Sequence, residues 1–204
     1  MSEIQVEQYQ TLMEVIKSRF DALDELINIG FNNFSISEVA AFHGRKVIEG
    51  IAFACLISTK NGFKTIPKEA IGQYNAEKIF KTLIRKNIEI FPSPSLLRIP
   101  TDAERKIHDV KIIIDGIPDL RITQSEMISK YQRMHNWLHE LNPFTKDGHK
   151  IFNEKYREQL LKDLNQLKAF LSSHFISING EAFYCTLSDK VDNTTKVIAL
   201  SRFK

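Results

Sequence analysis

Cysteine is scarce in this chain, since only Cys55 and Cys185 occur among its 204 residues. A single pair of cysteines cannot build the disulfide framework on which small secreted proteins depend. The first residues also lack a basic segment followed by an apolar stretch, which is the pattern of a secretory signal. These two absences lead us to expect a protein of the reducing cytoplasm.

Long hydrophobic runs are absent as well. The longest nearly apolar stretch extends from Val47 to Ile57 and is interrupted by Glu49. A membrane-spanning helix needs about 20 predominantly apolar residues, and this stretch is far shorter. The sequence therefore predicts a soluble protein that does not have a membrane as its partner.

Neither sign of charge dominates, because 28 lysines and arginines stand against 25 aspartates and glutamates, for a net charge of +3. This excess is too small to indicate nucleic-acid binding by itself. The basic residues are densest between residues 60 and 86, and the last four of them belong to one predicted helix: Lys78, Lys81, Arg85 and Lys86. These side chains either attract a nucleic-acid backbone or form the ordinary solvated face of a helix.

Apolar residues make up 43% of the chain, which is enough to build one substantial core. In five segments they recur at spacings of three and four residues, the period of one face of a helix. These segments are residues 6–29, 35–58, 76–86, 123–141 and 147–174. The second segment is apolar on nearly every side, so we expect it to be the central helix. Arg45 and Glu49 lie one turn apart in its middle and are expected to pair with each other.

Polar residues in front of three segments predict where these helices begin. Ser35 with Glu38, and Thr123 with Glu126, have the spacing of a capping box, in which the two side chains satisfy backbone N–H groups reciprocally. Asn75 precedes the third segment and is expected to act as its N-cap.

Prolines end the helical pattern between residues 91 and 122, because Pro92, Pro94 and Pro100 each remove a backbone donor and restrict the preceding residue. The sequence predicts an irregular excursion over this range. Within it we expect a strand at 110–114 or, alternatively, a short helix at 102–110.

The end of the chain changes to a strand-like pattern. Residues 182–188 and 196–203 are rich in aromatic and β-branched side chains and flank a turn-forming Asp-Asn-Thr segment, which predicts a β-hairpin at about 181–204. The expected fold class is therefore mainly α: a helical bundle of about five helices with a small C-terminal β-hairpin, in a single domain spanning residues 1–204.

Two histidines, His135 and His139, lie one helical turn apart, a spacing that can hold zinc. The position between them that would supply the carboxylate base of a metalloprotease is Asn136. Since no third ligand stands nearby, we expect no metal site, and a metal-dependent hydrolase remains the weakest of three functional hypotheses.

Arg133 and His139 form a second pair, separated by five residues. Six positions along a helix place two side chains about 120° apart around the axis and about 9 Å along it, so the pair does not converge within one helix. Two copies related by a two-fold axis could bring both pairs around one phosphodiester. Histidine would then move protons to and from the ribose and the leaving oxygen while arginine holds the charged phosphorane, with no metal or other cofactor.

Arg133 and His139, separated by five residues late in a helical bundle, resemble the signature of the HEPN (higher eukaryotes and prokaryotes nucleotide-binding) superfamily. Many of its members are dimeric, metal-independent ribonucleases of toxin–antitoxin and antiphage systems. More closely, the chain resembles a poorly characterised bacterial family of HEPN-like proteins. That resemblance rests on four features: Arg45-Lys46-Val-Ile-Glu49, Ala76-Glu-Lys-Ile-Phe80 leading into Phe91-Pro92, the block 131–144 that ends in Leu-Asn-Pro-Phe, and the terminal hairpin.

The resemblance implies a homodimer that cleaves or binds RNA in a prokaryotic defence or toxin system, with an antitoxin or another protein as a further partner. In this hypothesis His139 is the acid and base, Arg133 holds the phosphate, and His135 or Asn136 assists. The alternative from a different class is a non-catalytic helical module that binds a partner protein or a nucleotide.

Overall fold

Helices account for most of the fold in the computed structural model, which describes residues 3–30, 33–61, 65–140, 144, 146–178 and 181–201. Within these residues the chain forms six α-helices and two short 3-10 helices, Lys68–Ala70 and Pro118–Leu120. The α-helices are α1 (Glu3–Ile29), α2 (Phe34–Asn61), α3 (Ala76–Arg85), α4 (Asp102–His108), α5 (Gln124–Asn136) and α6 (Gly148–Ser172). The prediction of a mainly α fold is thereby confirmed.

The β structure is larger than the predicted hairpin, which is corrected to a five-stranded antiparallel sheet with the order β2-β1-β3-β4-β5. Its strands are β1 (Ser93–Arg98), β2 (Ile113–Gly116), β3 (Ser173–Ile178), β4 (Glu181–Thr186) and β5 (Lys196–Ser201). The two predicted strands correspond to β4 and β5. The strand that was missed, β3, follows α6 without an intervening residue, so the helix predicted to reach residue 174 ends at Ser172.

The segment predicted to be irregular contains regular structure. Both alternatives for it are present in part, as the short helix α4 and the strand β2, which begins later than predicted. A second strand that was missed is β1, which includes Pro94. Proline fits there because β1 pairs with β3 only at Ser93 and Pro94, and the carbonyl of Pro94 accepts a hydrogen bond from the N–H of Ile117.

Two of the three predicted helix starts are confirmed. The side chain of Asn75 accepts from the N–H of Lys78, and Thr123 forms its capping box with Glu126. The capping box predicted at Ser35 is wrong, because α2 begins one residue earlier and Asn33 Oδ1 accepts the N–H of Ile36 instead. An asparagine just outside the first turn thus takes the position assigned to serine.

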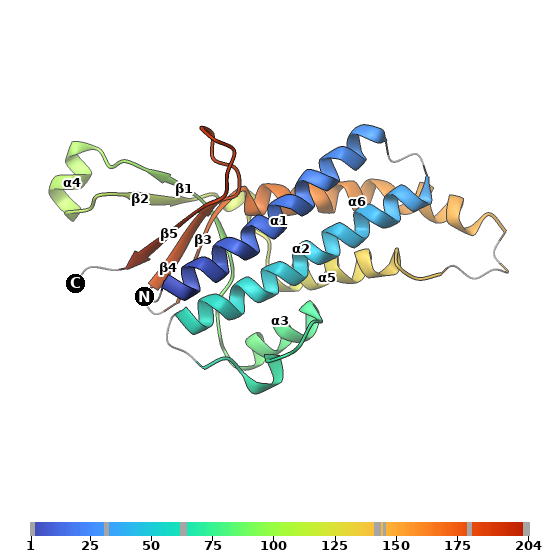
Figure 1. The fold of residues 1–204 in the computed structure, drawn as a ribbon, viewed down its shortest axis with the longest axis horizontal. Helices are drawn as coiled ribbons and strands as arrows, with labels where there is room; N and C mark the ends of the chain where they lie inside the picture. The colour runs from blue at the N-terminus through green and yellow to red at the C-terminus, as the bar shows by residue number, and fades with distance from the viewer. Residues whose placement is uncertain are drawn as a thin grey trace.

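The central position predicted for the second helix agrees with α2, which contacts α1, α3, α5 and α6. Figure 1 shows α1, α2, α5 and α6 side by side, with the sheet at one end and the β1–α4–β2 arm projecting beyond it. Gly44 allows this close packing, since a Cβ built there would lie 2.5 Å from Leu164 Cδ2 of α6 and 2.8 Å from Met134 Sδ of α5. None of the described helices has an apolar stretch long enough to cross a membrane.

A buried hydrogen bond joins the first helix to the sheet. The hydroxyl of Tyr9 lies 2.8 Å from His174 Nε2, and His174 Nδ1 lies 3.0 Å from the carbonyl of Leu171. A carbonyl only accepts, so Nδ1 carries the proton and Nε2 accepts from Tyr9. Both rings are fully buried, and burial lowers the pKa of His174 to about 4.

We expect His174 to make the fold less stable in acid. Its native pKa of about 4 lies below its ordinary value of 6.5, so between these values the unfolded chain binds more protons than the native one. Stability contributed at neutral pH is therefore lost as the pH falls from 6.5 towards 4, by about 3 kcal/mol in total. Urea denaturation at several pH values should show a shallower dependence for His174→Gln than for the wild type. Equal slopes for the two proteins would contradict this assignment.

Candidate active site

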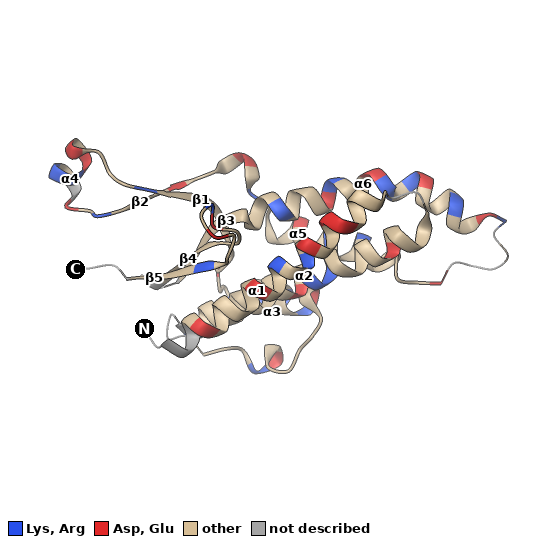
Figure 2. Cartoon of the chain, turned by 45° about the horizontal axis from the view of Figure 1, so that its top comes forward, with Lys and Arg blue, Asp and Glu red and all other residues tan. Residues whose placement is uncertain are grey.

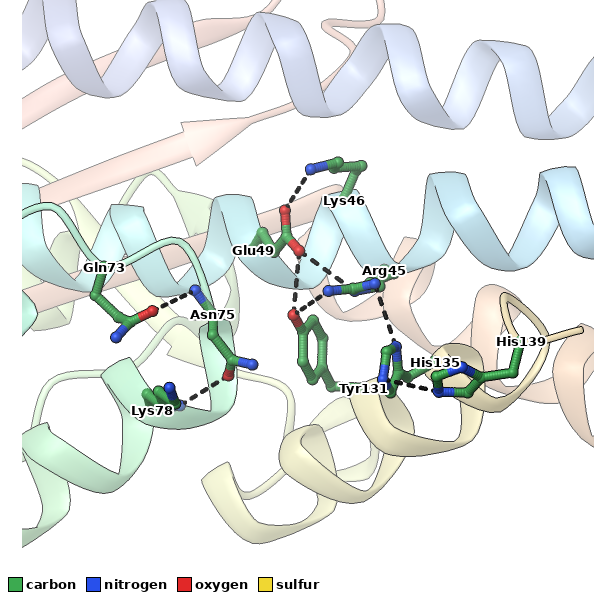
Figure 3. A network of polar contacts seen from close by, with 9 residues as sticks. All are labelled: Arg45, Lys46, Glu49, Gln73, Asn75, Lys78, Tyr131, His135 and His139. Atoms are coloured by element: carbon green, nitrogen blue, oxygen red, sulfur yellow. Dashed lines mark hydrogen bonds and ion pairs between the residues drawn. The ribbon is translucent and has the colours of Figure 1, made fainter.

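The candidate active site lies where the last turn of α5 meets the middle of α2. Tyr131 and His135 are on α5, His139 is on the turn that follows it, and Arg45 and Glu49 are on α2 (Figure 3). The side chain of His139 is exposed, that of His135 is half-buried and that of Glu49 is buried. The cluster therefore extends from solvent into the interface between the two helices.

Arg45 is the centre of the cluster. Its Nη1 donates to His135 Nδ1 at 3.3 Å and its Nη2 donates to the hydroxyl of Tyr131 at 3.0 Å. Its Nε lies 3.4 Å from Glu49 Oε1, which confirms the predicted pairing of the two residues. The guanidinium carbon also lies 5.0 Å from the centre of the Tyr131 ring. These four contacts fix the plane of the guanidinium.

Glu49 provides the negative charge that a half-buried arginine requires. Its Oε1 accepts from the hydroxyl of Tyr131 at 3.1 Å, and its Oε2 accepts from Lys46 Nζ at 2.7 Å. The side chain of Glu49 retains only 9% of its exposure, whereas that of Arg45 retains 25%. Two cations thus share one carboxylate, and the cluster keeps an excess positive charge on its solvent side.

The hydrogen bonds set the tautomer of His135. Arginine can only donate, so the Nδ1 of His135 that faces Arg45 must be an unprotonated acceptor. The neutral ring then carries its proton on Nε2, which lies 3.1 Å from His139 Nε2. His135 therefore donates to His139, whose own proton lies on Nδ1. Arg45 controls, through one ring, which nitrogen of the exposed histidine is protonated.

The surroundings of His135 favour its neutral form. Burial, Arg45 and His139 together lower the pKa of His135 below its ordinary value, and Glu77 of α3 opposes them only in part. The same arrangement disfavours a metal ion, because the neutral ring has no free lone pair on Nε2 while Arg45 occupies Nδ1. Within the described parts of the chain, no three metal-ligating side chains form a group.

Arg133 lies in a different environment from the histidines. Its Nε and Nη2 donate to Asp163 of α6 at 2.7 and 2.9 Å, and Lys130 Nζ donates to the same carboxylate at 2.8 Å. Asn136 is exposed and lines a cleft together with Arg133. Within one chain the structure thus brings His135 and His139 together, whereas Arg133 and Asn136 have other neighbours.

The basic residues of α3 and its C-cap residue, Lys86, are largely paired with acidic ones. Lys81 Nζ lies 2.6 Å from Glu77, while Arg85 and Lys86 lie 3.5 and 3.7 Å from Glu69. Lys78 is exposed. Figure 2 shows acidic and basic residues interspersed along the helices. This distribution agrees better with a solvated helix face than with a surface built to attract phosphate.

Sequence reasoning missed Arg45 and Tyr131 as members of the site. Arg45 and Glu49 were recognised as a pair, but their partners on α5 lie 82 to 90 positions away in the chain. The available signal was an arginine and a glutamate placed in an otherwise apolar helix, since buried charges require further polar partners. Comparison of the chain with protein-family models, curated proteins and solved structures found no match.

Proposed function

We propose that this protein is a metal-independent RNA-cleaving factor of a prokaryotic defence or toxin system, with Arg45, His135 and His139 as its reacting groups. The observation that supports the proposal is the hydrogen-bonded series from exposed His139 through His135 to Arg45. It joins a proton-transferring group at the surface to a cation that can hold a phosphate. In this proposal Arg45 takes the phosphate-binding role expected of Arg133, two of whose nitrogens donate to Asp163.

Binding of a phosphate and uptake of a proton favour each other at this site. When the histidine pair gains one proton, His139 carries hydrogen on both nitrogens and donates through Nε2 to His135. His135 must then carry its proton on Nδ1, where it opposes the donors of Arg45. The contact between Arg45 and His135 opens, and Nη1 becomes available to a phosphate oxygen.

The reaction needs one neutral and one protonated histidine pair, which a homodimer supplies. Once Arg45 holds the phosphate, the neutral pair of one copy carries its protons on Nδ1 of His135 and Nε2 of His139. The free Nδ1 of His139 then takes the proton of the ribose 2′-hydroxyl, and the 2′-oxygen attacks phosphorus. The bond between phosphorus and the 5′-oxygen breaks, and the protonated pair of the other copy gives its proton to that oxygen. The products are a 2′,3′-cyclic phosphate and a 5′-hydroxyl, and arginine stabilises the charge that develops between these two steps.

The direct test is RNA cleavage by the purified protein in the presence of a chelator. We expect products ending in 2′,3′-cyclic phosphate, and we expect His139→Ala to slow cleavage by roughly 10²- to 10⁴-fold. The melting temperature should stay close to that of the wild type, because the side chain of His139 is exposed.

A matched control is His149→Ala, which removes another exposed histidine, one that stacks on Phe34 at 4.4 Å and lies outside the cluster. It should retain the wild-type rate. RNA left intact by the wild type, or cleaved equally by His139→Ala, would contradict the proposal. Intact RNA would favour the alternative of a non-catalytic module that binds a partner protein or a nucleotide.

A further inference from the structure

A cavity of about 200 Å³ lies between the end of α5 and the first half of α6, and neither histidine of the candidate active site lines it. Its walls come from both helices and include Trp137, Phe152, Tyr156 and Arg133. Apolar cavities of about 150 Å³ are known to bind a single benzene-sized molecule, so this space is sufficient for one aromatic ring with a short substituent.

Three aromatic rings line this cavity. Trp137 and Phe152 meet edge to face with their centroids 4.8 Å apart, and Phe152 and Tyr156 meet at 4.6 Å. Trp137 is only 2% exposed, whereas Tyr156 is 39% exposed. Aromatic rings attract further rings in the same edge-to-face and offset arrangements. The wall therefore favours an aromatic ligand over an aliphatic one of equal size.

The polar side of the cavity carries one unbalanced positive charge. Asp163 accepts from Lys130, from Gln159 at 3.0 Å, and from Nε and Nη2 of Arg133. Two cations thus share a single carboxylate that is itself 1% exposed. The guanidinium is held by two hydrogen bonds, from Nε and Nη2, and among the residues that the structure describes its Nη1 forms no hydrogen bond or ion pair. The donors of Nη1 remain available to an anion.

We propose that this cavity binds a small aromatic carboxylate, with its ring against Trp137 and Phe152 and its carboxylate on Nη1 of Arg133. The excess charge selects a single anionic group, and the aromatic wall selects the ring that bears it. This binding site does not depend on RNA cleavage, because it uses none of the groups that act in the proposed reaction.

Titration with phenylacetate tests the site, since Trp137 is the only tryptophan of the chain and its fluorescence reports occupancy directly. We expect saturable binding of phenylacetate and at least tenfold weaker binding of phenylacetamide, which has the same shape without the charge. Arg133→Gln should weaken phenylacetate binding by roughly 10- to 100-fold, the usual effect of losing a hydrogen bond to a charged group. The same variant should leave phenylacetamide binding unchanged.

Two further variants keep the test decisive. Leu160→Phe narrows the cavity without altering its charge and should abolish binding of both compounds. Arg105→Gln removes an exposed arginine of α4 and should bind as the wild type does. If Arg133→Gln does not fold, Arg133→Lys replaces it, and the loss of Nη1 should still weaken phenylacetate binding. Equal affinity for acid and amide, or no saturable change in fluorescence, would overturn the proposal.

Discussion

Replacing Arg45 with lysine should reduce the rate of RNA cleavage by on the order of 10²- to 10³-fold, as expected when a donor to a developing oxyanion is lost. Lysine keeps the positive charge beside Glu49. It cannot reach His135 and Tyr131 at once, because its three donors radiate from one atom. The tautomer of His135 is then no longer fixed, and the phosphate loses its planar donor. Single-turnover cleavage of a labelled RNA in the presence of a chelator measures the change.

The fold provides a matched control for this substitution. Arg19 of α1 contacts His43 of α2 with its Nη1 3.5 Å from Nδ1, an arginine–histidine contact like that of Arg45 but away from α5. Arg19→Lys should therefore leave the cleavage rate within a factor of about three of the wild type, since it changes no group of the site. A similar loss in both variants would indicate damage to α2 rather than to catalysis. A fully active Arg45→Lys would contradict the proposed role of Arg45.

Replacing Asp163 with asparagine should destabilise the fold by about 3–5 kcal/mol, because it leaves the buried ammonium of Lys130 without a counter-charge. Burial by itself raises the pKa of Asp163, but hydrogen bonds from Arg133 and Lys130 outweigh it and hold this pKa below its ordinary value. The native carboxylate is therefore charged at neutral pH. We expect the melting temperature to fall by roughly 10 °C, since 1 kcal/mol corresponds to about 2–4 °C in a domain of this size.

Two comparisons separate this explanation from a general effect of losing a charge. Asp24→Asn removes the partner of Lys168 in an exposed ion pair whose side chains are 45% and 49% exposed, and it should cost less than about 1 kcal/mol. Adding Lys130→Met to Asp163→Leu removes both buried charges and should recover most of the lost stability. If the double variant is no more stable than Asp163→Asn, the unpaired ammonium is not the cause.

Features of the fold that depend on neighbouring residues could be predicted from the sequence. The cap at Asn75 and the capping box at Thr123 were correct because both ends of each hydrogen bond lie within three residues. The pairing of Arg45 with Glu49 and the proximity of His135 to His139 could also be predicted from the sequence, since each pair spans one helical turn.

Features that depend on distant residues could not be predicted. No helix-stop signal is present where α6 passes directly into β3. The change to a strand at Ser173 becomes visible only through the pairing of β3 with β4 and β1. The contact between Arg45 and His135 depends on how α2 and α5 pack, and Gly44 fixes that packing through its close approach to Met134. A sequence read segment by segment contains no signal for such a contact.

The hydrogen bond between Tyr9 and His174 has a consequence for the order in which the polypeptide folds. The two residues are separated by 165 positions, and Tyr9 also stacks on Phe183 at 4.7 Å. While the polypeptide emerges from the ribosome, α1 can pack on α2 early, but the end of α1 that carries Tyr9 lacks the sheet. Contacts of such long range form slowly, because a large loop must close first. Tyr9 therefore lacks its buried partners His174 and Phe183 until β3 and β4 have been synthesised.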